Sequence, residues 1–228
     1  DTRKVLYSGF GSDNYQGRVN SLCYGLDGWV YGSCGLFGGE ITNFHGEKFA
    51  LGDRDFRIRP DTGELEPATG RTQQSRPRDD WGNWFGCNSG TLALHYVLED
   101  HVLNRNPNLI PPSPTNYVPD YPDSTRLFSV GQPSLFKLSG PANQPTAVCG
   151  LGIYRDDLLG DGSVGNAFTC EPVNQLVHRL VLEPKGATFA GHRAEDEEQA
   201  EFLASTDPWF RPVQVTTGPD GALYVVDM

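Results

Sequence analysis

The same pattern, G-x-D-G-x-(V/L)-Y, occurs twice in this chain, at residues 25–31 (GLDGWVY) and 218–224 (GPDGALY). An Asp-Gly pair between two apolar runs is a strong hairpin signal, because the two-residue turn needs a positive φ that glycine adopts freely. Each copy follows a strand-like run, at 19–24 and 213–217, and opens another, at 29–32 and 222–226. A recurring hairpin predicts a repeat of small antiparallel sheets, as in a β-propeller.

The composition agrees with an all-β domain and excludes some partners. The 228 residues include 27 glycines and 17 prolines, which many short strands and turns require. The net charge of −11 argues against nucleic acid or an anionic membrane surface as a partner. No apolar run approaches the ~20 residues that a membrane-spanning helix needs.

The order of the strand-like runs predicts the blades. Runs that would begin a blade start near Arg18, Asn83, Thr146 and Arg211. They predict three to four blades, so we expect residues 1–228 to be a single partial β-propeller domain, a fragment of a longer chain. Other expectations concern single segments: strands at 55–59 and 64–68 around the turn 60–63, strands at 166–170 and 176–182, a proline-rich surface loop at 111–122, and a solvated acidic helical turn at 195–201.

Several longer strings resemble one bacterial family. They lie at 55–63 (DFRIRPDTG), 79–88 (DDWGNWFGCN), 153–157 (IYRDD), 165–168 (GNAF) and 205–213 (STDPWFRPV). They resemble the putative membrane-bound dehydrogenase family of planctomycetes and related bacteria, and the resemblance runs from about Val5 to Met228. It implies a six-bladed propeller similar to soluble quinoprotein glucose dehydrogenase, followed in many members by helical repeats and a haem-binding cytochrome c domain.

The resemblance also implies a cofactor, pyrroloquinoline quinone held with Ca²⁺ over the propeller axis. Guanidinium groups suit its carboxylates, and Ca²⁺ takes hard oxygen ligands from loops. Arg211 stands before the last hairpin, where the quinone enzymes place an arginine, and Arg18 and Asn20 occupy the equivalent position in the first blade. Arg155 is a further candidate for the cofactor, and Asn88 for the cation. Each has a purely structural alternative, such as loop hydrogen bonding or an ion pair with Asp156 or Asp157.

Departures from the family pattern affect the catalyst. Gly17 stands where the quinone enzymes carry their catalytic histidine, and Gly35-Leu36 stands where an acidic residue should follow. The lysine expected near Val173 is also absent. Because glycine cannot accept a proton, the known route of sugar oxidation needs a base from elsewhere.

The remaining features favour structural roles. His178 lies in a strand-like run, and His95 and His101 have no metal-site spacing. The acidic residues between Asp53 and Glu66 predict a solvated face, and Trp81 and Trp84 either fill a gap between blades or stack on a sugar ring. Cys34 and Cys87 fall in glycine-rich loops where a disulfide is one option, whereas the other cysteines are expected to be small buried residues.

Two functions therefore stay open. The first is a periplasmic or cell-surface dehydrogenase-like propeller that oxidises a sugar or alcohol and passes electrons to a cytochrome c domain, with haem only outside this fragment. The second is a propeller that has lost its catalytic histidine and serves as a carbohydrate-binding or assembly module. A haem motif downstream in the parent chain would favour the first.

Overall fold

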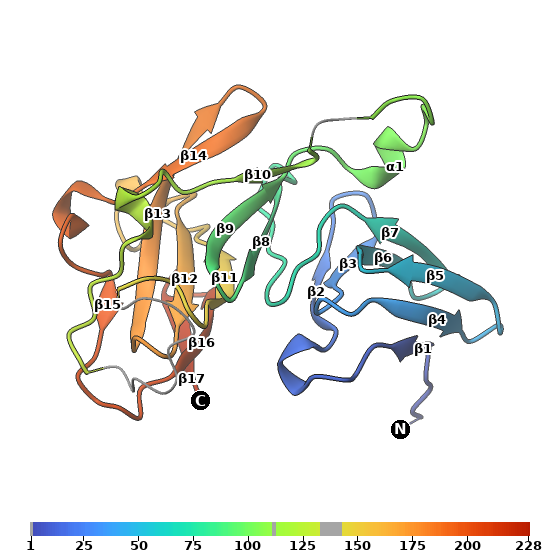
Figure 1. The fold of residues 1–228 in the computed structure, drawn as a ribbon, viewed down its shortest axis with the longest axis horizontal. Helices are drawn as coiled ribbons and strands as arrows, with labels where there is room; N and C mark the ends of the chain where they lie inside the picture. The colour runs from blue at the N-terminus through green and yellow to red at the C-terminus, as the bar shows by residue number, and fades with distance from the viewer. Residues whose placement is uncertain (1, 111–112, 133–142) are drawn as a thin grey trace.

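The computed structural model describes residues 2–110, 113–132 and 143–228, and its fold is all-β and resembles part of a β-propeller. Antiparallel sheets follow one another along the chain, from the N-terminal sheets at the right of Figure 1, through β8 and β9, to β11–β17 at the left. Among the described residues, no helix has the length and apolarity to cross a membrane.

The first blade is a four-stranded sheet in the order β2-β3-β6-β7. Its strands are β2 (Asn20–Tyr24), β3 (Val30–Ser33), β6 (Asp55–Arg59) and β7 (Glu64–Ala68), so both predicted hairpins are confirmed. A side sheet consists of β4 (Gly39–Asn43) and β5 (Lys48–Gly52), which are inserted between β3 and β6, and of β1 (Tyr7–Phe10), which precedes the blade and pairs with β4. Ile41 and Leu51 of this sheet share a buried core with Phe56 and Ile58 of the blade.

The second blade begins earlier than the sequence predicted. Its named strands are β8 (Trp84–Asn88), β9 (Thr91–Tyr96) and β10 (Thr115–Tyr117). Residues 74–78 form its innermost segment through antiparallel bridges that join Gln74 to Cys87 and Arg78 to Trp84. The expected blade start near Asn83 is therefore the second strand of this blade. The first was hard to find in the sequence because the 74–78 segment, QSRPR, is polar and contains a proline.

The third blade consists of β11 (Cys149–Ile153), β12 (Ala167–Glu171), β13 (Leu176–Lys185) and β14 (Thr188–His192), with the short β15 (Leu203–Ala204) beside β13. The strands predicted at 166–170 and 176–182 are thus confirmed. Apolar side chains of β8, β9, β11, β12 and β13 form one buried cluster, which joins the second and third blades.

The last hairpin is β16 (Pro212–Thr217) and β17 (Leu223–Asp227), which pair only with each other among the described residues. Both copies of the repeated pattern form the same turn: Gly28 and Gly221 have φ of 78° and 82°. The backbone N–H groups of Gly25 and Gly218 each donate to the carbonyl four residues on, at 2.8 Å.

Short helical segments occupy the connections. They are η1 (Tyr15–Gly17), α1 (Asp100–Leu103), η2 (Asp123–Thr125), η4 (Asp161–Ser163) and η5 (Glu195–Glu197). The predicted acidic turn is present as η5 and most of residues 195–201 are exposed, although Glu197 is buried and pairs with Arg179. The proline-rich segment is likewise not all surface loop, because β10 pairs with β9 and Val118 is buried; residues 111–112 lie outside the described residues.

Candidate functional site in the axial cavity

The inner segments of the three blades and of the last hairpin line one cavity of roughly 300 Å³. It is bordered by 21–23 of β2, by 75–78, by 151–153 of β11 with Arg155, and by 214–217 of β16. These segments run in the same direction. Asn20 contacts Ser75, and Tyr24, further along β2, contacts Arg78. In the same way Gly150 lies against Val213, Gly152 against Val215, and Arg155 against Thr217. The cavity therefore follows the propeller axis, with an entry mouth where these segments begin and an exit mouth where they end.

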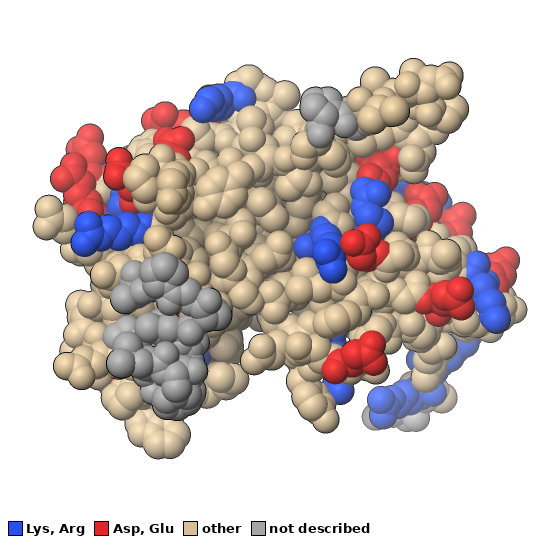
Figure 2. Space-filling view, viewed as in Figure 1, with Lys and Arg blue, Asp and Glu red and all other residues tan. Residues whose placement is uncertain are grey.

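Three arginines surround the cavity near Cys23. Burial raises the pKa of the Cys23 thiol, and the positive charges of Arg78, Arg155 and Arg76 act against that shift. A cluster of cations is unusual in a chain with a net charge of −11. On the face shown in Figure 2, by contrast, acidic and basic side chains of the described residues are interspersed.

Two of these arginines are neutralised by carboxylates. Arg76 pairs with Asp55 at 2.6 Å, and both side chains are fully buried. Arg155 donates from Nε to Asp80 Oδ1 at 2.6 Å at the exit mouth. Asp55 is thus an exception to the solvated face predicted for the acidic run of the first blade, in which Asp53, Asp61 and Glu64 are exposed.

Arg78 differs from the other two. Its Nε donates to the carbonyl of Tyr24 at 2.7 Å, and its Nη1 donates to the carbonyl of Asp79 at 2.8 Å. Among the described residues no carboxylate lies within ion-pair distance of it, and carbonyls position a guanidinium without cancelling its charge. No sequence pattern singled out Arg78, because only the parallel inner segments bring it into the axis.

The buried Arg76 joins the first two blades. Its guanidinium carbon lies 4.6 Å from the centroid of the Tyr96 ring and 5.6 Å from that of Tyr31. Its Nη2 is 3.9 Å from Glu99 Oε1, and burial raises the pKa of Glu99 while Arg76 lowers it. This packing makes Arg76 a structural cation, and its exchange for another residue would leave Asp55 buried without a charge partner.

The predicted residues Arg18 and Asn20 lie at the entry mouth. Arg18 is exposed, with its guanidinium carbon 4.5 Å from the ring centroid of Tyr15. The Asn20 amide donates to the carbonyls of Arg18 and Gln73, each at 2.8 Å, and its Oδ1 accepts from the N–H of Ser75. Asn20 therefore ties the first blade to the second through backbone groups.

Asn88, Arg211 and Arg155 have partners of their own. Asn88 Oδ1 accepts the N–H of Gln73 at 2.8 Å. Asn20 and Asn88 therefore both hydrogen-bond to the backbone of Gln73, Asn20 at its carbonyl and Asn88 at its N–H. Arg211 donates to the carbonyl of Pro172 at 2.7 Å, whereas Arg155 lies at the other end of the inner strands. Among the described residues, no group of three or more His, Cys, Asp or Glu side chains is placed to hold a metal ion.

The two glycines at the expected catalytic positions are packed against each other. A Cβ on Gly17 would lie 2.6 Å from the carbonyl oxygen of Gly35, and a Cβ on Gly35 would lie 2.1 Å from that of Gly17. Gly35 also has a φ of 67°. The same Cβ on Gly17 would lie 2.4 Å from Cε2 of the Phe37 ring. A catalytic side chain at position 17 would therefore require a different backbone.

The strand histidines are buried away from the cavity. His178 Nδ1 lies 2.8 Å from Glu201 Oε2, and its Nε2 lies 3.1 Å from the carbonyl of Ser124. His95 contacts Thr188 at 2.9 Å, and burial lowers its pKa to about 4. Neither borders the axial cavity, so the preference for a structural role is consistent with their positions.

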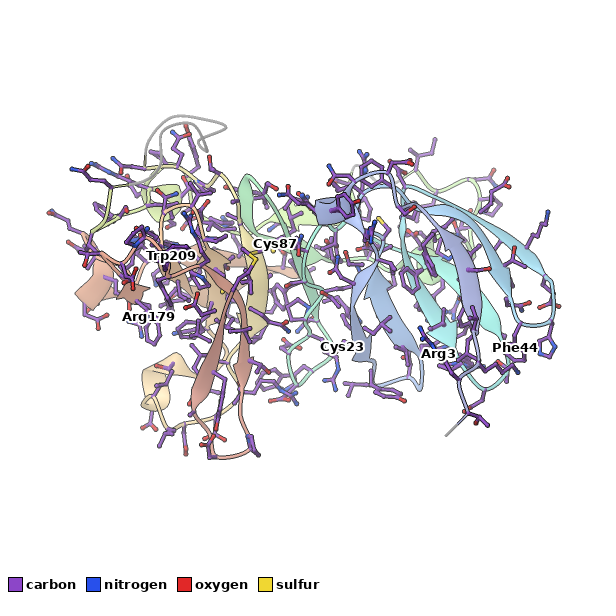
Figure 3. The ribbon with its side chains drawn as sticks, turned by 90° about the horizontal axis from the view of Figure 1, so that it is seen from below. Arg3, Cys23, Phe44, Cys87, Arg179 and Trp209 are labelled. Carbon is purple, nitrogen blue, oxygen red and sulfur yellow. The ribbon has the colours of Figure 1, made fainter. Side chains whose placement is uncertain are left out.

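The cysteines of the described chain are all free thiols, including Cys34 and Cys87. Cys87, labelled in Figure 3, lies in β8 beside the β11–β12 sheet and is completely buried. Burial raises the pKa of Cys34 and of Cys149 to about 12 in each case. These thiols therefore stay protonated and belong to the core.

The two tryptophans of the DDWGNW string have different positions. Trp84 is buried against Tyr31 with ring centroids 4.2 Å apart, so it fills the space between two blades. Trp81, three residues earlier, is 77% exposed. Of the two, only Trp81 is free to contact a ligand.

Comparison with known proteins places the chain in a family. A family described as a domain of unknown function (DUF7133) matches residues 1–228, so the chain belongs to that family. No curated protein matches the sequence. One solved structure with a similar fold is that of a putative oxidoreductase (glucose dehydrogenase) from the bacterium Thermus thermophilus. It has 18% sequence identity and a TM-score of 0.47, over 93% of this chain and 60% of that one. This chain thus spans about three fifths of that protein's length.

Proposed function

We propose that this chain is the ligand-binding core of a dehydrogenase-like β-propeller, and that its axial cavity binds a small carboxylated compound. The observation that supports this most directly is Arg78, a cation at the cavity wall with no carboxylate partner among the described residues. A guanidinium binds a carboxylate through paired N–H donors, and a partly enclosed cavity strengthens that interaction.

Pyrroloquinoline quinone, the cofactor that the family resemblance implies, is itself a tricarboxylate and suits the charge of this cavity. The fit of the complete quinone and Ca²⁺ site is poor, however. Asn88 uses its carbonyl oxygen on Gln73, and the Arg211 side chain is bound to the Pro172 carbonyl. Arg78 is the side chain that would meet a carboxylate, because Arg155 already pairs with Asp80, and we derive no chemical step through the quinone.

Two kinds of activity compete for this cavity. In the first, the longer protein oxidises a sugar or alcohol in the periplasm or at the cell surface and passes electrons to a cytochrome c domain. The base would then come from outside the first blade. In the second, the propeller binds its ligand without catalysis, which the close packing of Gly17 against Gly35 favours.

Calorimetric titration of the full-length protein with pyrroloquinoline quinone, with and without Ca²⁺, tests the binding proposal. Arg78→Gln should weaken binding about tenfold or more, since it removes a charge-assisted contact. Arg105→Gln is the matched control, because Arg105 is an exposed arginine that does not border the axial cavity. Loss of binding in both variants or in neither, or no binding to the unmodified protein, would overturn the proposal. If binding is confirmed, dye reduction with a panel of sugars and alcohols separates the enzyme from the binding module.

A further inference from the structure

A second cavity, of roughly 350 Å³, lies at the seam between the second and third blades. We call it the seam pocket. Its walls come from the Trp81 loop, from β8, from the end of β11, from the loop at Val164 and from the β13–β14 hairpin. A cavity of this volume is within the range of small-molecule sites.

The walls of the seam pocket are mostly apolar. Phe85, Ile153, Val164, Leu182 and Phe189 contribute side chains, and Trp81 borders the opening. Phe85 is fully buried, while Val164 is 46% exposed at the rim. The pocket is therefore an apolar recess with an open side, in contrast to the arginine-lined axial cavity.

The aromatic wall is held rigidly. The Phe189 ring lies 5.4 Å from Phe85 and 5.0 Å from His95, measured between ring centroids. His95 is fixed in turn by its contact with Thr188 at 2.9 Å. Packed rings of this kind keep a flat surface without losing side-chain entropy when a ligand binds.

The carboxylate that borders the pocket is fully engaged. Asp79 Oδ1 accepts the N–H groups of Trp81 at 3.0 Å and of Asn83 at 2.8 Å, and Oδ2 accepts the Asn83 amide at 2.6 Å. These bonds satisfy Asp79 and fix the loop that carries Trp81. A cation would therefore find no unpaired carboxylate, and an anion would find no cation, among the described side chains that line the pocket.

Trp81 is an exposed ring on a fixed loop beside the seam pocket. The indole is 77% exposed, on a loop held by three hydrogen bonds, and it lies at the edge of an apolar recess. Holding such a ring in water contributes little to folding, whereas a rigid exposed aromatic residue is a typical binding surface.

From these features we propose that the seam pocket is a second binding site, for a neutral aromatic small molecule that stacks on Trp81. The chemical class of the ligand follows from the side chains that line the pocket. Apolar rings and aliphatic groups favour a flat apolar ligand. A charged ligand would have no partner, because the hydrogen bonds of Asp79 are already satisfied. This site does not depend on the proposed function of the axial cavity.

The test uses 2-naphthol, a neutral bicyclic aromatic compound, titrated into the full-length protein and followed by its fluorescence. Trp81→Ala should weaken binding about tenfold, since an aromatic contact and its buried area are lost. Val164→Arg, which places a long charged side chain at the rim, should have a similar effect. Both positions are exposed, and thermal unfolding verifies that the variants are folded.

Two controls locate the site. Trp209→Ala should leave binding unchanged, because Trp209, labelled in Figure 3, is 83% exposed and borders neither the seam pocket nor the axial cavity. Thr216→Arg, at an exposed position that lines the axial cavity and not the seam pocket, should also leave it unchanged, and the anion 2-naphthoate should bind more weakly than 2-naphthol. The proposal is overturned if 2-naphthol does not bind, if Trp81→Ala has no effect, or if binding is lost with Thr216→Arg, which would assign the probe to the axial cavity.

Discussion

The two copies of the G-x-D-G-x-(V/L)-Y pattern form the same turn in very different surroundings. In the first copy, Asp27 Oδ2 accepts the hydroxyl of Tyr31 at 2.9 Å, and in the second, Asp220 Oδ2 accepts that of Tyr224 at 3.1 Å. Tyr31 is only 2% exposed, whereas Tyr224 is 49% exposed. The local sequence thus builds the turn, and the neighbouring blade decides what the tyrosine contributes.

The difference comes from strands outside the pattern. Arg57 of β6 donates to Tyr31 and Asp27, each at 3.2 Å, and Trp84 of the second blade covers the ring. The second hairpin has no such cover, because β17 has no further strand beside it in the described part of the chain. The same motif is therefore a core element in one place and an edge element in the other.

The largest expected effect comes from removing the two tyrosines. Tyr31→Ala should lower the free energy of unfolding by about 3–5 kcal/mol, because it leaves a cavity against Trp84 and removes a buried hydroxyl bond. Tyr224→Ala should cost less than about 1 kcal/mol, since half of its ring is already in water. Chemical denaturation of both variants measures the difference. Equal losses would show that a partner covers the second hairpin in the full-length protein.

A smaller difference is expected for the two aspartates. Asp27→Asn keeps an oxygen for the turn but weakens the contact with Arg57, so we expect a loss of about 1 kcal/mol. Asp220→Asn has no arginine partner to lose among the described residues and should change stability by less than about 0.5 kcal/mol. The single variant Arg57→Met and the double variant Asp27→Asn/Arg57→Met, measured beside Asp27→Asn, give the coupling energy. A coupling near zero would contradict a role for Arg57 in distinguishing the two copies.

The smallest effect is a dependence on pH. Burial raises the pKa of Tyr31 to about 12, with the carboxylate of Glu99 and the Asp27 contact adding to the shift and Arg57 opposing it. The folded state therefore keeps a proton that the unfolded state loses above its ordinary pKa of 10.0. This contribution to stability is complete below pH 10.0 and declines as the pH rises toward about 12.

Unfolding curves from neutral pH to about pH 11 test that dependence. Stability should fall less steeply with pH in Tyr31→Phe than in the unmodified protein. Tyr224→Phe should follow the unmodified protein more closely, because the pKa of Tyr224 is raised chiefly by its hydrogen bond to Asp220, an interaction on the surface that solvent screens. An identical slope in all three proteins would mean that Tyr31 does not titrate as a buried group.

Much of the fold could be predicted from turn chemistry. The Asp-Gly pairs located two hairpins, and the Pro60–Gly63 turn located β6 and β7. The innermost segment of the second blade, residues 74–78, was not predicted, because a proline and two arginines are not typical of a strand. The first glycine of the repeated pattern was also unexplained until the structure showed the tyrosine ring above it. A Cβ on Gly218 would lie 2.1 Å from Tyr224 Cε2.

The sequence by itself determined that this is an all-β chain of repeated hairpins, since turn residues and alternation act over a few neighbours. It also predicted that the first blade lacks the catalytic base, because Gly17 stands at the position of the catalytic histidine and has no side chain. Tertiary structure alone decided which arginine reaches the axis without a carboxylate partner among the described residues, which tryptophan is free, and that Asp55 is buried. Those outcomes depend on contacts between residues far apart in sequence, such as Asn20 with Gln73 and Arg155 with Asp80, which no local pattern encodes.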